Sequence, residues 1–176
     1  MNDAGQCGSL VHAIGLLVVR TALLETTLVE LVVRLAEEAG EAPKAARVKF
    51  TGKSGMPLVE ELRNRGRHDV ADPYEVLAEQ RNHLVHGNGW HIPDAGYHVV
   101  QAPPSRRGVS RPLREKLWQA DEIEHLSLAV IRLEKVVQAE VRRGGRLPDA
   151  YTVTGPIRDP WVPGSAEIPV EDPPSA

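Results

Sequence analysis

The feature that most constrains this chain is a helical repeat of apolar residues near its N-terminus. Between residues 9 and 40 the steps alternate between four and three positions, which places one set of side chains on one face of an α-helix. That set is Leu10, Ile14, Leu17, Thr21, Leu24, Leu28, Leu31 and Leu35. Further apolar residues, including Val11, Val18, Val29 and Val32, widen the stripe. We therefore expect a long helix from Ser9 to Gly40 that contacts more than one neighbour, either other helices or a second copy of the chain.

Length and composition fit one domain with a tail. The chain has 176 residues, and its 24 acidic and 21 basic residues give a net charge of −3, which disfavours a small histone-like nucleic-acid binder. The single cysteine excludes a disulfide framework and a cysteine zinc site, and it fits a cytoplasmic location. The longest apolar run, residues 10–19, is too short to span a bilayer and follows no basic segment. Neither a membrane anchor nor a secretory signal is expected.

The next elements are predicted from their boundaries. Residues 41–54 contain proline, glycine and four basic residues, which favours a loop. A short helix is expected from Pro57 to Arg65, and Gly66 would end it. A second helix is expected to begin with Asp72 as its N-cap and to run to His86, before Gly87. Two further residues support that start: Pro73 at the first helical position and Glu75 as the capping-box partner.

The second half predicts a hairpin, a helix and a tail. Residues 88–101 alternate around a turn at 93–96, which indicates a small β-hairpin. A last amphipathic helix is expected from Asp121, with Glu124 completing a capping box, to Gly144. Residues 144–176 hold half of the 14 prolines and the whole net charge of −3, which predicts an extended or disordered tail. The predicted fold is an all-α helical bundle over residues 1–143, with the hairpin inserted after the helix that ends at His86, followed by this tail.

The most informative stretch is residues 77–87. Arg81 falls on the inward stripe of its helix, where a charge is costly unless it is paired or lines a cleft. Asn82 is adjacent in sequence, and His86 lies four positions further on, about 40° around the helix axis. A guanidinium, an amide and an imidazole are thus predicted to converge at the end of this helix.

Such a trio suits cleavage of RNA without a metal ion. An imidazole that titrates near pH 6.5 can take the proton of a ribose 2′-hydroxyl. A guanidinium can hold the phosphate through two hydrogen bonds and offset the charge that develops during attack. The amide can hold either partner in place. Deoxyribose lacks the 2′-hydroxyl, so DNA is not an expected substrate.

These residues carry a family resemblance. Arg81-Asn82-His83-Leu84-Val85-His86 resembles the Arg-Asn-x-x-x-His motif of HEPN domains, and the resemblance covers roughly residues 9–143. It implies an all-α bundle that forms a homodimer with two motifs in one cleft. It also implies a metal-independent endoribonuclease of a toxin–antitoxin or other defence system, with an antitoxin protein as a possible partner. Arg81 and His86 would then be catalytic, and Asn82 would be the supporting polar residue.

Two further positions bear on this resemblance. Residues 63–68, Arg-Asn-Arg-Gly-Arg-His, match the same short pattern, but Gly66 interrupts the helix and no apolar stripe continues through it. We therefore assign the motif to residues 81–86. In one HEPN subgroup a tyrosine two residues after the motif histidine is the target of nucleotidyl transfer. Here that position is Asn88, so neutralisation by that route is not expected.

The alternatives to a catalytic role are structural roles for the same residues. Arg81 could pair with an acidic residue of the first helix, such as Glu25, and His86 could simply end its helix, where a cation is favoured. The domain would then be a non-catalytic HEPN-like dimeric module that binds RNA or a protein partner. The histidines at 83, 86, 91 and 98 invite a metal site, but no acidic partner completes a known spacing. We expect no metal and no cofactor.

Two basic runs could follow an RNA backbone or could be solvated loops. The candidate RNA-binding residues are Lys44, Arg47, Lys49, Lys53, Arg106, Arg107 and Arg111, and the second run continues to Arg114 and Lys116. Few aromatic residues are present, 4% of the chain, which argues against base stacking as the main contact with RNA.

Overall fold

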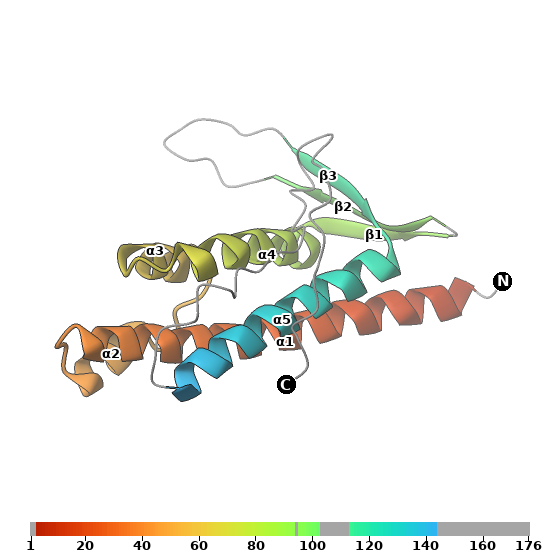
Figure 1. Ribbon diagram of the computed structural model, residues 1–176. Helices are drawn as coiled ribbons and strands as arrows, with labels where there is room; N and C mark the ends of the chain where they lie inside the picture. Colours follow the sequence, from red (N-terminus) through yellow and green to blue (C-terminus); the bar gives the residue numbers. More distant parts are fainter. Residues whose placement is uncertain (1–2, 94, 103–112, 144–176) are drawn as a thin grey trace.

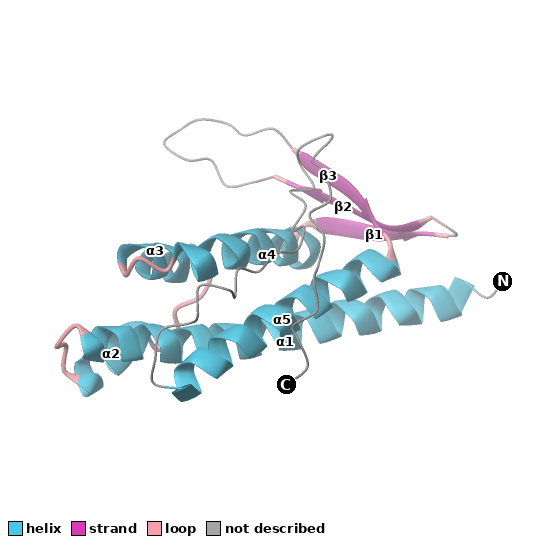
Figure 2. Ribbon diagram, viewed as in Figure 1, coloured by secondary structure: helices cyan, strands magenta, loops and turns pink. Residues whose placement is uncertain are grey.

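The structure is a computed structural model that describes residues 3–93, 95–102 and 113–143. Over these residues it is mainly helical, with a small antiparallel sheet at one end (Figure 1, Figure 2). The helices are α1 (Asp3–Glu38), α2 (Pro43–Phe50), α3 (Met56–Asn64), α4 (His68–His86) and α5 (Ala120–Arg143). The strands are β1 (Asn88–Ile92), β2 (Gly96–Gln101) and β3 (Arg114–Trp118). None of the described helices is long and apolar enough to cross a membrane.

Helix α1 is the central helix of the bundle. Its predicted stripe is confirmed, because six of the eight stripe residues are buried and the other two, Ile14 and Leu35, are partly buried against the core. Helix α5 lies along α1 and runs in the same direction, whereas α4 runs in the opposite direction above them (Figure 1). Gly40 ends the first helix with a positive φ of 87°, as its predicted role as a C-cap requires.

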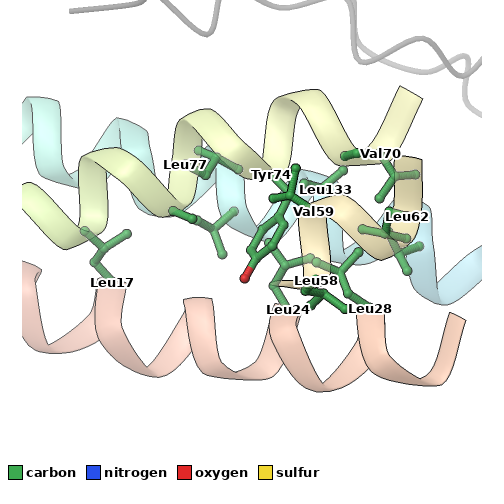
Figure 3. Packing of buried hydrophobic residues seen from close by; sticks show 14 of the residues in the cluster. Leu17, Leu24, Leu28, Leu58, Val59, Leu62, Val70, Tyr74, Leu77 and Leu133 are labelled. Atoms are coloured by element: carbon green, nitrogen blue, oxygen red, sulfur yellow. The ribbon is translucent and has the colours of Figure 1, made fainter. Parts of the chain in front are cut away.

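The core is aliphatic and lies between α1, α3, α4 and α5. Figure 3 shows leucine and valine side chains of these helices packed around the ring of Tyr74, which is fully buried. Val99 of β2 and Trp118 of β3 extend this core under the sheet. The sheet is therefore anchored on the helices through its inner face.

The prediction of a loop over residues 41–54 is wrong, because α2 occupies most of it. Pro43 starts this helix at a position where its missing N–H costs nothing. Ala46 and Phe50, one turn apart, are completely buried. Eight residues are too few for a stable isolated helix, so the burial of this face holds α2 in place.

Helix α4 begins five residues earlier than predicted, with Arg67 and not Asp72 at the N-cap position. Pro73 lies inside the helix, and the predicted capping pair is used differently. Both Asp72 and Glu75 bind Arg63 of α3, at N–O distances of 2.6 Å. The helix starts at His68 because residues 70–71 are already buried in the core. The predicted end after His86 is confirmed.

The predicted hairpin is confirmed, but it belongs to a three-stranded sheet. Strands β1, β2 and β3 lie in that order and are antiparallel, with Trp90 opposite His98 and His98 opposite Leu117. Strand β3 was not predicted from the sequence. The expected all-α class therefore holds for the bundle, with a sheet in place of the lone hairpin.

The last helix starts one residue earlier than expected and is capped by other residues. The backbone N–H of Gln119 donates to Glu122, so Glu122 and not Glu124 takes the capping position. The predicted end at Gly144 and the Pro-rich segment 144–176 lie outside the described residues, as does the predicted boundary between domain and tail.

Candidate active site

The candidate site lies where the last turn of α4 meets the sheet. Gly87 follows the helix directly, and a side chain there would meet Val99 of β2 at 2.3 Å and the carbonyl of His83 at 2.6 Å. Only a glycine lets β2 approach the helix end this closely. The side chain of His86, on the residue before Gly87, is exposed.

The structure brings Arg81, Asn82 and His86 together. The Nη1 atom of Arg81 donates to Asn82 Oδ1 at 2.9 Å and lies 3.5 Å from His86 Nε2. Arg81 and Asn82 are partly buried. The predicted convergence of a guanidinium, an amide and an imidazole is therefore present, with Arg81 between the other two.

The expected alternative, an ion pair between Arg81 and Glu25, is absent from the described part of the chain. Glu25 Oε1 instead accepts the hydroxyl of Tyr74 at 2.8 Å, and that hydroxyl also accepts the N–H of Gly55 at 2.8 Å. Burial, followed by the charge of Glu25, raises the pKa of Tyr74. Glu25 thus serves the contact between α1 and α4, not the charge of Arg81.

The guanidinium of Arg81 is incompletely satisfied. Its Nε atom is buried and has no hydrogen-bond partner among the described residues, and no described carboxylate forms an ion pair with it. An unsatisfied buried donor costs stability, and such groups are tolerated mainly at functional sites. This charge can meet an incoming anion without first breaking a salt bridge.

The contact between Arg81 and His86 favours one form of the imidazole. A guanidinium can only donate hydrogen bonds, so in this 3.5 Å contact Nε2 of His86 takes the role of acceptor. An unprotonated, exposed Nε2 is the form that a general base needs.

His83 is a supporting residue of this site that the sequence did not assign. It is fully buried, its Nδ1 accepts the indole N–H of Trp118 at 3.2 Å, and its Nε2 lies 3.4 Å from the carbonyl of Arg114. Burial lowers the pKa of His83 below its ordinary value of 6.5, and the charges of Lys116 and Arg114 act in the same direction. The sequence showed only that His83 is three residues from His86, which does not distinguish a buried from an exposed ring.

This lowered pKa predicts a stability loss in acid. Between the pKa of folded His83 and that of the unfolded chain, only the unfolded state binds the proton. The contribution of His83 is therefore complete above about pH 6.5 and is lost as the pH falls towards the lower, folded value. The free energy of unfolding, measured with urea, should fall between about pH 7.5 and about pH 5.5. The fall should be larger for the wild type than for His83→Gln. Equal losses would contradict the prediction.

The second copy of the pattern, residues 63–68, differs from the first in how its charges are paired. Gly66 has a positive φ of 73° between α3 and α4, so the interruption predicted there is confirmed. Its three arginines are bound to carboxylates: Arg63 to Asp72 and Glu75, Arg65 to Glu41 and Glu61, and Arg67 to Asp69 and Glu140. Every one of these charges is already used within the fold, in contrast to that of Arg81.

The histidines invoked for a metal site have different surroundings. His98 contacts Glu115 at 2.7 Å and the ring of Trp90 at 4.5 Å between ring centroids, whereas His83 faces Trp118. In the parts of the chain that the structure describes, no three His, Cys, Asp or Glu side chains are grouped so that they could hold a metal ion.

Several side chains of the first basic run make contacts within the fold. Arg47 binds Glu30 at 2.6 Å, Lys49 lies 3.9 Å from Glu41, and the amino groups of Lys49 and Lys53 lie over the ring of Phe50. Lys44 is exposed on α2, and nothing places this run beside Arg81.

The second basic run lies largely outside the described residues, including Arg106, Arg107 and Arg111. At its end, Arg114 lies 3.7 Å from Glu79, and Lys116 lies 3.3 Å from Glu122. Arg114 belongs to the surroundings of the site through the contact of its carbonyl with His83.

Comparison with known proteins gives the chain no family. No family model matches it, and neither the curated proteins nor the solved structures contain a match. The assignment of a function therefore depends on the chemistry of the site itself.

Proposed function

We propose that this chain is a metal-independent endoribonuclease of the HEPN type, in which Arg81, Asn82 and His86 form the active site. The observation that carries the proposal is the contact of one guanidinium with both the amide and an exposed imidazole at the end of α4. Each group has the chemistry that cleavage of an RNA phosphodiester requires. The guanidinium is free of carboxylates in the described structure, as phosphate binding requires.

The proposed reaction is attack by a ribose 2′-hydroxyl on the adjacent phosphate. His86 Nε2 takes the hydroxyl proton, the 2′-oxygen forms a bond to phosphorus, and the bond to the 5′-oxygen breaks. The departing 5′-oxygen takes up a proton from water, and His86 returns its proton to the solvent. Arg81 binds the phosphate oxygens and offsets their growing charge, and Asn82 holds Arg81 through its amide oxygen. The products are a 2′,3′-cyclic phosphate and a 5′-hydroxyl.

A homodimer belongs to this proposal. Between residues 11 and 23, α1 exposes four large apolar side chains: Val11 (65%), Leu16 (43%), Val19 (57%) and Leu23 (46%). Exposed apolar surface of this kind is typical of an interface. A role as a cytoplasmic toxin or defence effector, controlled by an antitoxin protein, follows from the resemblance to HEPN domains.

The same exposed surface favours a second candidate function. A non-catalytic HEPN-like dimeric module that binds RNA or a protein partner would also need this face of α1. The two candidates differ in what the exposed imidazole of His86 does, and therefore in whether RNA is cleaved.

The deciding experiment is incubation of purified protein with a mixed RNA pool in the presence of a metal chelator. We expect cleavage with 2′,3′-cyclic phosphate ends, and no cleavage of the same sequences made as DNA. Once a cleavage site is known, the same RNA can be made with the 2′-hydroxyl removed at that nucleotide only. This RNA should resist cleavage at that position and at no other. Intact RNA in the presence of a folded dimer would refute the ribonuclease and favour the binding module.

A further inference from the structure

The last turn of α4 is held against the sheet by three polar contacts, one of them buried and two partly buried. The side chain of Gln101 in β2 donates to the carbonyl of Asn82 at 3.3 Å. On the next residue, His83 accepts the indole N–H of Trp118 and contacts the carbonyl of Arg114, both in β3. Strands β2 and β3 therefore bind Asn82 and His83, two consecutive residues of the motif.

The hydrogen-bond chemistry of this contact determines the state of His83. An indole N–H can only donate, so Nδ1 of His83 must be unprotonated. Its Nε2 then carries the hydrogen and donates to the carbonyl of Arg114. The chain of bonds runs from Trp118 through a neutral His83 to the backbone of β3, and both rings are buried, at 0% and 1% exposure.

This arrangement separates the tasks of the two histidines. His86 is exposed and contacts Arg81, whereas His83 is enclosed and contacts Trp118 and the carbonyl of Arg114. The helix end would otherwise be free to fray, because the last turn lacks partners within the helix. A displacement of about 1 Å in a catalytic group can cost about a hundredfold in rate.

We propose that His83 and Trp118 are positioning residues, whose buried hydrogen bond fixes the last turn of α4 on β3 and thereby sets the orientation of Asn82 and His86. Its effect on cleavage rests on the proposed ribonuclease function. The fixed geometry itself does not, and it can be measured without RNA.

The first test uses ¹H–¹⁵N NMR on the full chain to determine which imidazole nitrogens carry a hydrogen. In the wild type at neutral pH we expect His83 to be neutral with its hydrogen on Nε2. Trp118→Phe keeps an aromatic ring at this position but removes the N–H donor, and it should shift the ring signals of His86. Phe50→Leu, an equally buried change on α2, should leave those signals in place. A His83 that is protonated on Nδ1, or His86 signals that Trp118→Phe leaves unchanged, would overturn the proposal.

The second test measures cleavage by the same proteins. Trp118→Phe should lower kcat about tenfold or more with little change in KM, and Phe50→Leu should stay within about twofold of the wild type. His83→Gln keeps one acceptor and one donor, and it should retain more activity than His83→Leu. In the His83→Leu protein, adding Trp118→Phe should have almost no further effect, because the bond is already lost. Independent, additive losses would overturn the proposal. A wild type that cleaves no RNA would refute the ribonuclease alone, since the NMR test still decides the positioning role.

Discussion

Replacing His86 with alanine is expected to lower RNA cleavage by roughly 10²–10⁴-fold while the protein stays folded. The imidazole is the only group of the trio that can accept a proton near neutral pH, and its Nε2 is exposed beside the guanidinium of Arg81. Because the side chain is exposed and outside the core, its removal should change the free energy of unfolding by less than about 0.5 kcal/mol. Cleavage in the presence of chelator and urea unfolding measure the two quantities.

The matched control for this change is His125→Ala. His125 is also an exposed histidine on a helix, α5, so its loss has the same chemical character without touching the site. It should cleave RNA at the wild-type rate. If His86→Ala cleaved RNA as fast as His125→Ala, the imidazole would have no role in the reaction and the assignment of the active site would fail.

The parts of the fold that could be predicted are those whose signal is local and periodic. The stripe of α1 comprises eight residues between Leu10 and Leu35, so its buried face could be identified without knowing what covers it. The hairpin of β1 and β2 follows from alternation on both sides of a short turn. The approach of Arg81, Asn82 and His86 follows from helical geometry alone, since all three lie on one helix.

The parts that escaped prediction depend on distant partners. Strand β3 pairs with β2 across a long connection, and its Arg-Glu-Lys-Leu-Trp sequence has only Trp118 as a strongly buried residue. Helix α2 exists because Ala46 and Phe50 find a place in the core. The start of α4 was misplaced because Asp72 and Glu75 have the spacing of a capping box but bind Arg63 instead.

The site shows the same division. Its three reactive groups could be found from spacing, but their support could not, because His83 acquires its role from Trp118, 35 residues away in sequence. The pairing of the Arg81 charge could not be predicted from the sequence either. Whether its charge pairs with Glu25 depends on Tyr74, whose hydroxyl binds that carboxylate in the folded protein.

The largest stability effect is expected at the connection between α3 and α4. Arg67 binds Glu140 of α5 through both carboxylate oxygens, and the two side chains are only 13% and 5% exposed. Burial alone would lower the pKa of Arg67, but its hydrogen bonds to Asp69 and Glu140 outweigh burial and raise that pKa. Arg67 therefore stays charged within the bundle, and its contact with Glu140 joins α5 to the start of α4.

Arg67→Ala should lower the free energy of unfolding by about 3–5 kcal/mol, because it leaves the carboxylate of Glu140 buried without its partner. Arg47→Ala is the matched control. It breaks an ion pair of similar geometry with Glu30, but both side chains are exposed, at 56% and 40%, so the loss should stay below about 1 kcal/mol. The double change of Arg67→Met with Glu140→Leu should recover most of the loss, since it removes both charges and keeps apolar volume. Urea unfolding of the four proteins decides the matter: equal losses for Arg67→Ala and Arg47→Ala would mean that Glu140 reaches solvent and that this pair does not hold α5 to α4.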